Sequence, residues 1–74
     1  MKEKVIAEIF AKRIKELRLE KNLSQREVAK ILGLSQPSYI RYELRAGEPS
    51  LATLVGLARF YQVSVGYLLG LEDY

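Results

Sequence analysis

The sequence contains no cysteine and no histidine among its 74 residues, and only two prolines. These absences exclude disulfides, thiolate nucleophiles, zinc fingers and acid–base catalysis by imidazole. We therefore expect no metal site, no cofactor and no enzymatic activity. No apolar run approaches the roughly 20 residues that span a membrane, and no signal-type segment is visible. The expected location is the cytoplasm, with no membrane partner.

What is present is the composition of a folded domain. Apolar residues make up 49% of the chain and charged residues 28%, which excludes disorder as the default state. The length suits a single domain over residues 1–74. Residues 1–48 carry eleven basic against seven acidic residues, a balance of +4, whereas residues 49–74 carry one basic and two acidic residues. A surface for a polyanion such as DNA is therefore expected in the first two-thirds.

Apolar periodicity and capping signals predict an all-α fold without strands. Ile6, Phe10, Ile14 and Leu17 recur at helical spacing, and an asparagine at position 22 ends this first helix. Four further helices each follow a serine that can accept hydrogen bonds from the first turn. The five predicted helices cover about residues 5–21, from Ser24 to Gly33, from Ser35 to about position 43, from Ser50 to about position 61, and from Ser64 to Gly70.

The second and third predicted helices have the spacing of a helix-turn-helix. With Gln25 as the first position, the small Ala29 is fifth, where two helices cross closely, and Gly33 is ninth, where the turn needs positive φ. Tyr39 and Tyr42 fall at the fifteenth and eighteenth positions, which should be buried. Each tyrosine brings a hydroxyl that must reach a partner or solvent.

Several sequence blocks, in order and with matching spacers, resemble the Cro/phage-repressor (XRE) helix-turn-helix family. They are Arg13-Ile14-Lys15-Glu16-Leu17-Arg18, Leu23-Ser24-Gln25-Arg26-Glu27-Val28-Ala29, Leu32-Gly33-Leu34-Ser35-Gln36, Tyr42-Glu43, Pro49-Ser50-Leu51 and Tyr67-Leu68-Leu69-Gly70. The resemblance covers residues 9–70. It implies a five-helix, lambda-repressor-like domain whose third helix enters the major groove of double-stranded DNA. It further implies a sequence-specific transcriptional regulator, a repressor acting as a homodimer on a palindromic operator.

The resemblance also assigns roles to individual positions. Base-reading positions are occupied by Gln36, which suits adenine, Pro37, which offers apolar contact, and Arg41, which suits guanine. Phosphate-contacting positions are occupied by Gln25, Arg26, Ser38 and Arg45. Arg18 and Glu43 match a buried ion pair between the first and third helices. A dimer seam is expected among Tyr67, Leu68, Leu71 and Tyr74.

The chain departs from the family pattern after Glu43. Arg45 stands where the family commonly has glycine, and a glycine appears at Gly47 instead. We therefore expect Gly47 to take the left-handed conformation and the third helix to run about one turn longer. Ile40 places an apolar side chain on or near the DNA face.

Two alternatives remain open at this point. One is an antitoxin that binds a protein toxin and regulates its own promoter. The other is a protein-binding adaptor that has lost DNA contact, which Ile40 and the lack of lysines after Glu43 would allow.

Overall fold

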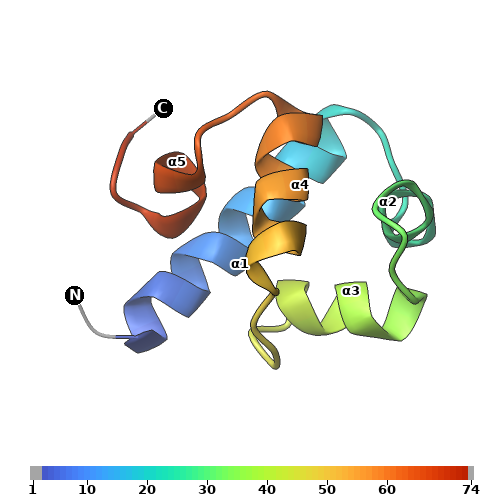
Figure 1. Cartoon of the computed structure of the whole chain (residues 1–74), viewed down its shortest axis with the longest axis horizontal. Coiled ribbons are helices and arrows are strands. Elements are labelled where there is room, and N and C mark those ends of the chain that lie inside the picture. The colour runs from blue at the N-terminus through green and yellow to red at the C-terminus, as the bar shows by residue number, and fades with distance from the viewer. Residues whose placement is uncertain (1–2, 74) are drawn as a thin grey trace.

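The computed structural model describes residues 3–73, and over this range the chain is all-helical, as predicted (Figure 1). Short turns join the helices, and no strand occurs in the described part. The helices are α1 (Glu3–Glu20), α2 (Gln25–Ile31), α3 (Gln36–Glu43), α4 (Leu51–Tyr61) and α5 (Val65–Leu69).

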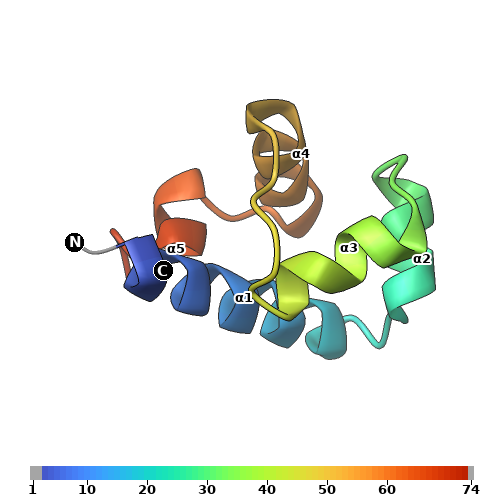
Figure 2. The ribbon, with the colours of Figure 1, turned by 90° about the horizontal axis from the view of Figure 1, so that it is seen from below.

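The long α1 forms the base on which the other helices are arranged (Figure 2). Both α3 and α5 pack on α1, while α2 packs on α3 and α4 packs on α5. The α2–α3 pair thus lies at one end of the molecule (Figures 1 and 2). This arrangement leaves the outer side of α3 uncovered by any other helix.

All four predicted serine caps are confirmed. Each cap serine has extended backbone angles, and its hydroxyl accepts a hydrogen bond from the backbone N–H three residues later. Ser24 and Glu27 form the predicted reciprocal capping box, with distances of 3.0 Å and 2.9 Å. Because local sequence alone specifies these caps, the starts of α2 to α5 were predictable.

The ends of α1 and α2 also follow the prediction. Asn22 adopts a left-handed conformation with φ of 56°, and the Leu23 N–H donates to the Arg18 carbonyl at 3.1 Å. Gly33 has φ of 71° in the turn between α2 and α3. The tight turn of the helix-turn-helix is therefore formed where the spacing required it.

The connection after α3 differs from the prediction in two ways. The helix ends at Glu43 and is not extended by a turn, and the left-handed residue is Arg45, with φ of 63°, whereas Gly47 does not have positive φ. The Ala46 N–H donates to the Arg41 carbonyl at 2.8 Å, and the Arg45 N–H donates to the Tyr42 carbonyl at 3.3 Å. This Schellman closure needs a left-handed residue at position 45, so the chain places arginine where glycine would be easier.

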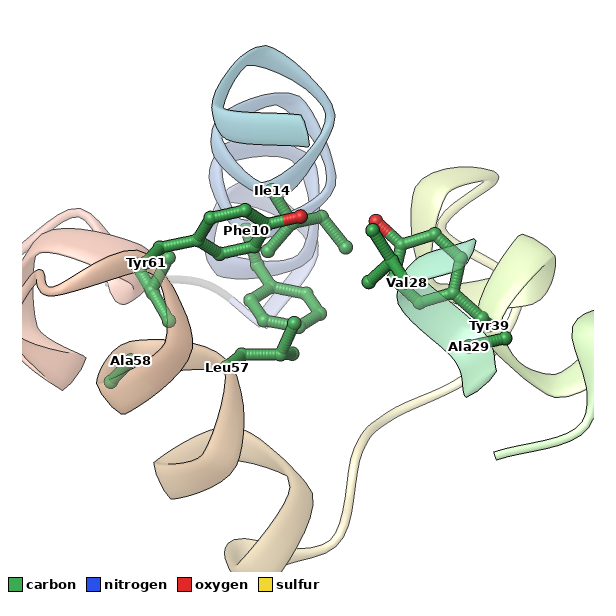
Figure 3. Packing of buried hydrophobic residues seen from close by; sticks show 9 residues of the cluster. Phe10, Ile14, Val28, Ala29, Tyr39, Leu57, Ala58 and Tyr61 are labelled. Carbon is green, nitrogen blue, oxygen red and sulfur yellow. The ribbon is translucent and has the colours of Figure 1, made fainter. Parts of the chain in front are cut away.

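The hydrophobic core draws on all five helices. Tyr39 of α3 is fully buried at its centre, as the motif required, and Tyr42 is half-buried beside Phe10, with ring centroids 6.3 Å apart. Figure 3 shows side chains from α1, α2, α3 and α4 meeting in this core. The core cluster consists of Phe10, Ile14, Val28, Ala29, Tyr39, Leu57, Ala58, Tyr61 and Leu68.

Candidate nucleic-acid interface

Helix α3 has one buried side and one exposed side. Tyr39 faces the core, and Tyr42 and Glu43 are half-buried beside it. The opposite side carries exposed residues from the first turn to the C-cap, namely Gln36, Pro37, Ser38, Arg41 and Leu44. The structure therefore brings all three candidate base-reading residues onto one uncovered surface.

The first turn of this surface is held by the cap of α3. The Ser35 hydroxyl accepts from the Ser38 N–H at 3.2 Å and donates to the Ser38 hydroxyl at 2.8 Å. Gln36 and Pro37 lie in this first turn, where proline removes no helical hydrogen bond. Both side chains are exposed, so the start of α3 presents them outward from a fixed backbone.

Arg41 is exposed but turned back along its own helix end. Its Nη2 donates to the Ala46 carbonyl at 2.9 Å, and a Cβ built on Gly47 would lie 3.5 Å from its Nε. In this conformation the guanidinium caps the loop after α3. To reach a guanine, Arg41 has to release that carbonyl.

The Glu43 carboxylate is the centre of a hydrogen-bonded cluster between α1, α2 and α3. Arg18 donates to it through Nε at 2.7 Å and Nη2 at 3.0 Å, the Tyr39 hydroxyl donates at 2.5 Å, and the Gln25 amide donates at 3.1 Å. These four donors match the roughly four lone-pair positions of a carboxylate. Arg18 also donates to the Leu23 carbonyl at 2.9 Å, so the cluster ties α3 to the α1–α2 turn.

This cluster shifts the pKa values of its members. Burial opposes ionisation of Glu43, but hydrogen bonds from Arg18, Tyr39 and Gln25 outweigh it and lower the pKa of the carboxyl. The hydrogen bond to Glu43 raises the pKa of Arg18 against the effect of burial. Burial, together with the hydrogen bond to Glu43, raises the pKa of Tyr39. At neutral pH the cluster is a charged pair with a neutral phenol.

Gln25, a candidate phosphate contact, is half-buried at the start of α2 and bound to Glu43. A glutamine amide has two N–H groups, so donating one to Glu43 fixes the amide plane and leaves the second for another acceptor. Sequence reasoning placed Gln25 near phosphate but missed this orienting bond. The bond could have been expected on chemical grounds, because a buried carboxylate such as Glu43 needs donors beyond its arginine partner.

The remaining phosphate candidates lie on different elements, with Ser38 in the first turn of α3 as described above. Arg26 is exposed in the first turn of α2. Arg45 lies in the loop after α3 and pairs with Glu8 of α1 at 3.0 Å, with both side chains about half exposed. Such an exposed pair contributes little to stability, so it does not prevent Arg45 from binding elsewhere.

The residues of the expected dimer seam differ in exposure. Leu68 has no exposed area and belongs to the core of the single chain, so it is not available to a second copy. Tyr67 is half-buried under Arg13, whose guanidinium carbon lies 4.2 Å from the ring centroid. Leu71 is exposed, and Tyr74 lies outside the described residues.

Arg13 is a structural residue that sequence reasoning missed. Its Nη1 donates to the backbone carbonyls of Tyr67 and, at 2.7 Å, of Glu72, which holds the end of the described chain against α1. Nothing in the local pattern around Arg13 indicates partners more than fifty residues away.

Within residues 3–73, no helix is long and apolar enough to cross a membrane. No group of acidic residues in that range has the arrangement of a metal site.

Comparison with known proteins settles the family. A family model described as helix-turn-helix matches residues 14–68, which include α2, α3 and their turn. The chain belongs to the Cro/phage-repressor (XRE) helix-turn-helix family. The family and the all-helical class are thus as the sequence indicated. No solved structure matched the chain.

This chain is similar to several bacterial regulators. YobD of Bacillus subtilis (strain 168), an uncharacterized HTH-type transcriptional regulator, is 40% identical over 65 residues, covering 88% of this chain and 58% of YobD. RstR of Vibrio cholerae, a transcriptional repressor of the cryptic phage CTXphi, is 38% identical over 61 residues, or 82% of this chain and 55% of RstR. BcrR of Enterococcus faecalis, a transcriptional activator, is 30% identical over 64 residues, or 86% of this chain and 31% of BcrR. The chain thus spans little more than half the length of the first two.

Proposed function

We propose that this protein is a sequence-specific, double-stranded DNA-binding transcriptional regulator, and that it acts as a repressor. The observation that carries the proposal is the two-sided character of α3. Its exposed side presents Gln36, Pro37 and Arg41. Its other side is bound to α1 through the ion pair of Glu43 with Arg18. A reading helix must be both uncovered and rigidly positioned, because base discrimination depends on fixed hydrogen-bond geometry.

The charge near this surface supports DNA as the partner. Exposed basic residues occur on α2, on α3 and in the loop after α3, and they are Arg26, Lys30, Arg41 and Arg45. Residues 25–42 contain one acidic residue, Glu27, and its carboxylate is engaged in the cap of α2. Phosphate contacts from such a rim position a protein on the duplex, and contacts to base edges then specify the sequence.

We propose that the regulator is a homodimer on a palindromic operator. Leu51 and Val55 are exposed one turn apart on α4, and Leu71 is exposed after α5, so apolar side chains on helices other than α3 are available to a second copy of the chain. Half-sites would then lie about 34 Å apart, one turn of the double helix. The relatives include a repressor and an activator, so repression is a separate part of the proposal from DNA binding.

Selection of bound duplexes from a random pool, followed by titrations of variants, tests this function. We expect a palindromic consensus. Gln36→Ala should lose about 1–3 kcal/mol at one base position and relax the preference there. Gln25→Ala should weaken all duplexes about equally and reduce the dependence of affinity on salt. Enrichment of no sequence, or equal losses from both variants on specific and scrambled duplexes, would contradict the proposal.

The exposed leucine and valine on α4 also favour a second candidate, an antitoxin whose apolar surface binds a protein toxin. The mass of the purified chain in solution separates the two readings of that surface. A dimer supports self-association through it. A chain that stays monomeric both at high concentration and in the presence of DNA favours binding of a different protein through this surface. Absence of DNA binding at low salt identifies an adaptor.

A further inference from the structure

The exposed side of α3 carries an apolar stripe that the candidate base-reading residues do not account for. Pro37, Ile40 and Leu44 are spaced by three and four residues, so they lie along one side of the helix. Pro37 is exposed, Ile40 is half-buried, and Leu44 at the C-cap is 66% exposed. We call these three residues the apolar stripe.

Packing within the chain covers the stripe only in part, since Leu44 borders a shallow hollow lined by Ala7, Glu8 and Arg45 but stays mostly exposed. Leu44 remains in helical register, because its N–H donates to the Ile40 carbonyl at 3.1 Å, yet its side chain stays largely outside the core. The core-facing positions of α3 are already filled by Tyr39, with Tyr42 at its edge. An exposed leucine on a helix that is otherwise well packed marks a contact surface when other apolar residues extend it.

The polar groups beside the stripe indicate which kind of partner surface it fits. Arg41 lies on the same side, but its guanidinium is bound to the Ala46 carbonyl. Beyond the first turn, therefore, the outward surface of α3 in the described conformation offers mainly carbon. Exposed Arg26 in the first turn of α2 and exposed Arg45 after α3 suit phosphates. This pairing of an apolar centre with a basic rim is complementary to the major groove, where thymine presents the C5-methyl group.

We propose that the apolar stripe reads thymine methyl groups, so that Ile40 and Leu44 join Pro37 as residues that determine operator sequence. This inference rests on the proposed DNA-binding function and adds a substrate preference to it. Each half-site carries thymines opposite the middle and C-terminal end of α3, and apolar contact with their methyl groups adds discrimination there to the hydrogen bonds that Arg41 can make with a guanine. Adenine recognition by Gln36 is confined to the part of the half-site facing the start of the helix.

Replacing thymine by uracil tests this directly, because uracil differs only by lacking the methyl group. On the operator obtained by selection, each thymine is replaced singly by uracil, and the affinity of the full chain is measured. A buried methyl group is worth about a fourfold change in affinity. We expect about that loss at two or more thymines of each half-site.

Variants then assign the methyl groups to side chains. Leu44→Ala should abolish the uracil penalty at one thymine, and Ile40→Val, which keeps the fold, should reduce it at a neighbouring one. Leu19→Ala is the matched control, because Leu19 is 53% exposed but lies on α1. This control should retain every penalty. Thermal unfolding of each variant confirms that it is folded.

The outcomes separate the inference from the function on which it rests. If the protein binds its operator specifically but loses no affinity when thymine is replaced by uracil, thymine reading by the apolar stripe is overturned and the proposed function stands. The same holds if the uracil losses persist unchanged in both stripe variants. Retained operator affinity in Leu44→Ala, together with its loss of a protein partner, shows that the stripe binds protein and also overturns the inference. Absence of any specific DNA binding overturns the proposed function and the inference together.

Discussion

Arg18 and Glu43, on helices α1 and α3, form a two-point ion pair that is almost completely buried. The nitrogen–oxygen distances are 2.7 Å and 3.0 Å, and the side chains retain 10% and 3% of their exposed area. The same chain contains an exposed pair of the same residue types, Arg45 and Glu8, at 3.0 Å. The two pairs allow the effect of burial to be measured within one molecule.

Neutralising the acidic partner should affect the two pairs very differently. Glu43→Gln strands the buried Arg18 charge and should lower the free energy of unfolding by roughly 3 kcal/mol. Glu8→Gln should lower it by less than about 1 kcal/mol, because water screens and solvates Arg45. Urea denaturation of the two variants measures both values. Similar losses in the two would show that burial does not govern the strength of these pairs.

Acid should destabilise the protein through the same carboxylate. The folded state lowers the pKa of Glu43 below its ordinary 4.5, so its contribution is complete above about that pH and is lost as pH falls through the folded value. Glu27, whose pKa is lowered by hydrogen bonds from Ser24, acts in the same direction. The free energy of unfolding, measured between pH 7 and pH 3, should fall less steeply in Glu43→Gln than in the wild type. Parallel curves would contradict this assignment.

Arg45 occupies a left-handed position that glycine would adopt without strain. Arg45→Gly should therefore raise the free energy of unfolding by about 1 kcal/mol, reduced by whatever the exposed contact with Glu8 contributes. Gly47→Ala is the matched control. A Cβ there would meet Arg41 at 3.5 Å, which is ordinary contact, and the backbone is not in the left-handed region. Thermal denaturation should show Gly47→Ala to be neutral or slightly stabilising. A large loss of unfolding free energy in Gly47→Ala would indicate instead that Gly47 takes the left-handed conformation, as the sequence had predicted.

Two core tyrosines should respond in opposite ways to loss of their hydroxyl groups. Tyr39 donates to Glu43, so Tyr39→Phe should cost about 2 kcal/mol, the range for a hydrogen bond to a charged group. Among the described residues, the Tyr61 hydroxyl is buried without a hydrogen-bond partner, although Figure 3 shows it pointing toward the Tyr39 hydroxyl. Tyr61→Phe should therefore be neutral or stabilising by denaturation. A loss comparable to that of Tyr39→Phe would indicate that the two hydroxyls are bonded.

The helix-turn-helix is the part of the fold that local sequence specifies most completely. Ser24 with Glu27 and Ser35 with Pro37 fix where α2 and α3 begin, and Gly33 supplies the turn between them. Each of these signals acts over three or four residues, so they can be recognised without knowing the tertiary structure. The exposed side of α3 follows from the same helical periodicity, once Tyr39 is placed in the core.

One error concerns local hydrogen bonding and the other concerns packing between distant segments. The Schellman closure after α3 selected Arg45 as the left-handed residue, although glycine at position 47 is the stronger local signal. Leu68 looked available to a partner, but packing of α5 against α1 buries it completely.

The sequence by itself thus determined the family, the helices and the residues on the outer side of α3, because caps, turns and periodicity are short-range properties. Only the tertiary structure decided how those residues are held. Glu43 could bind Arg18, Tyr39 and Gln25 only after three helices had packed, and Arg13 could reach the carbonyls of Tyr67 and Glu72 only when α5 had packed on α1. The physical reason is that a buried charge or carbonyl accepts whichever donors the fold brings within hydrogen-bonding distance, and spacing along the chain does not encode that distance.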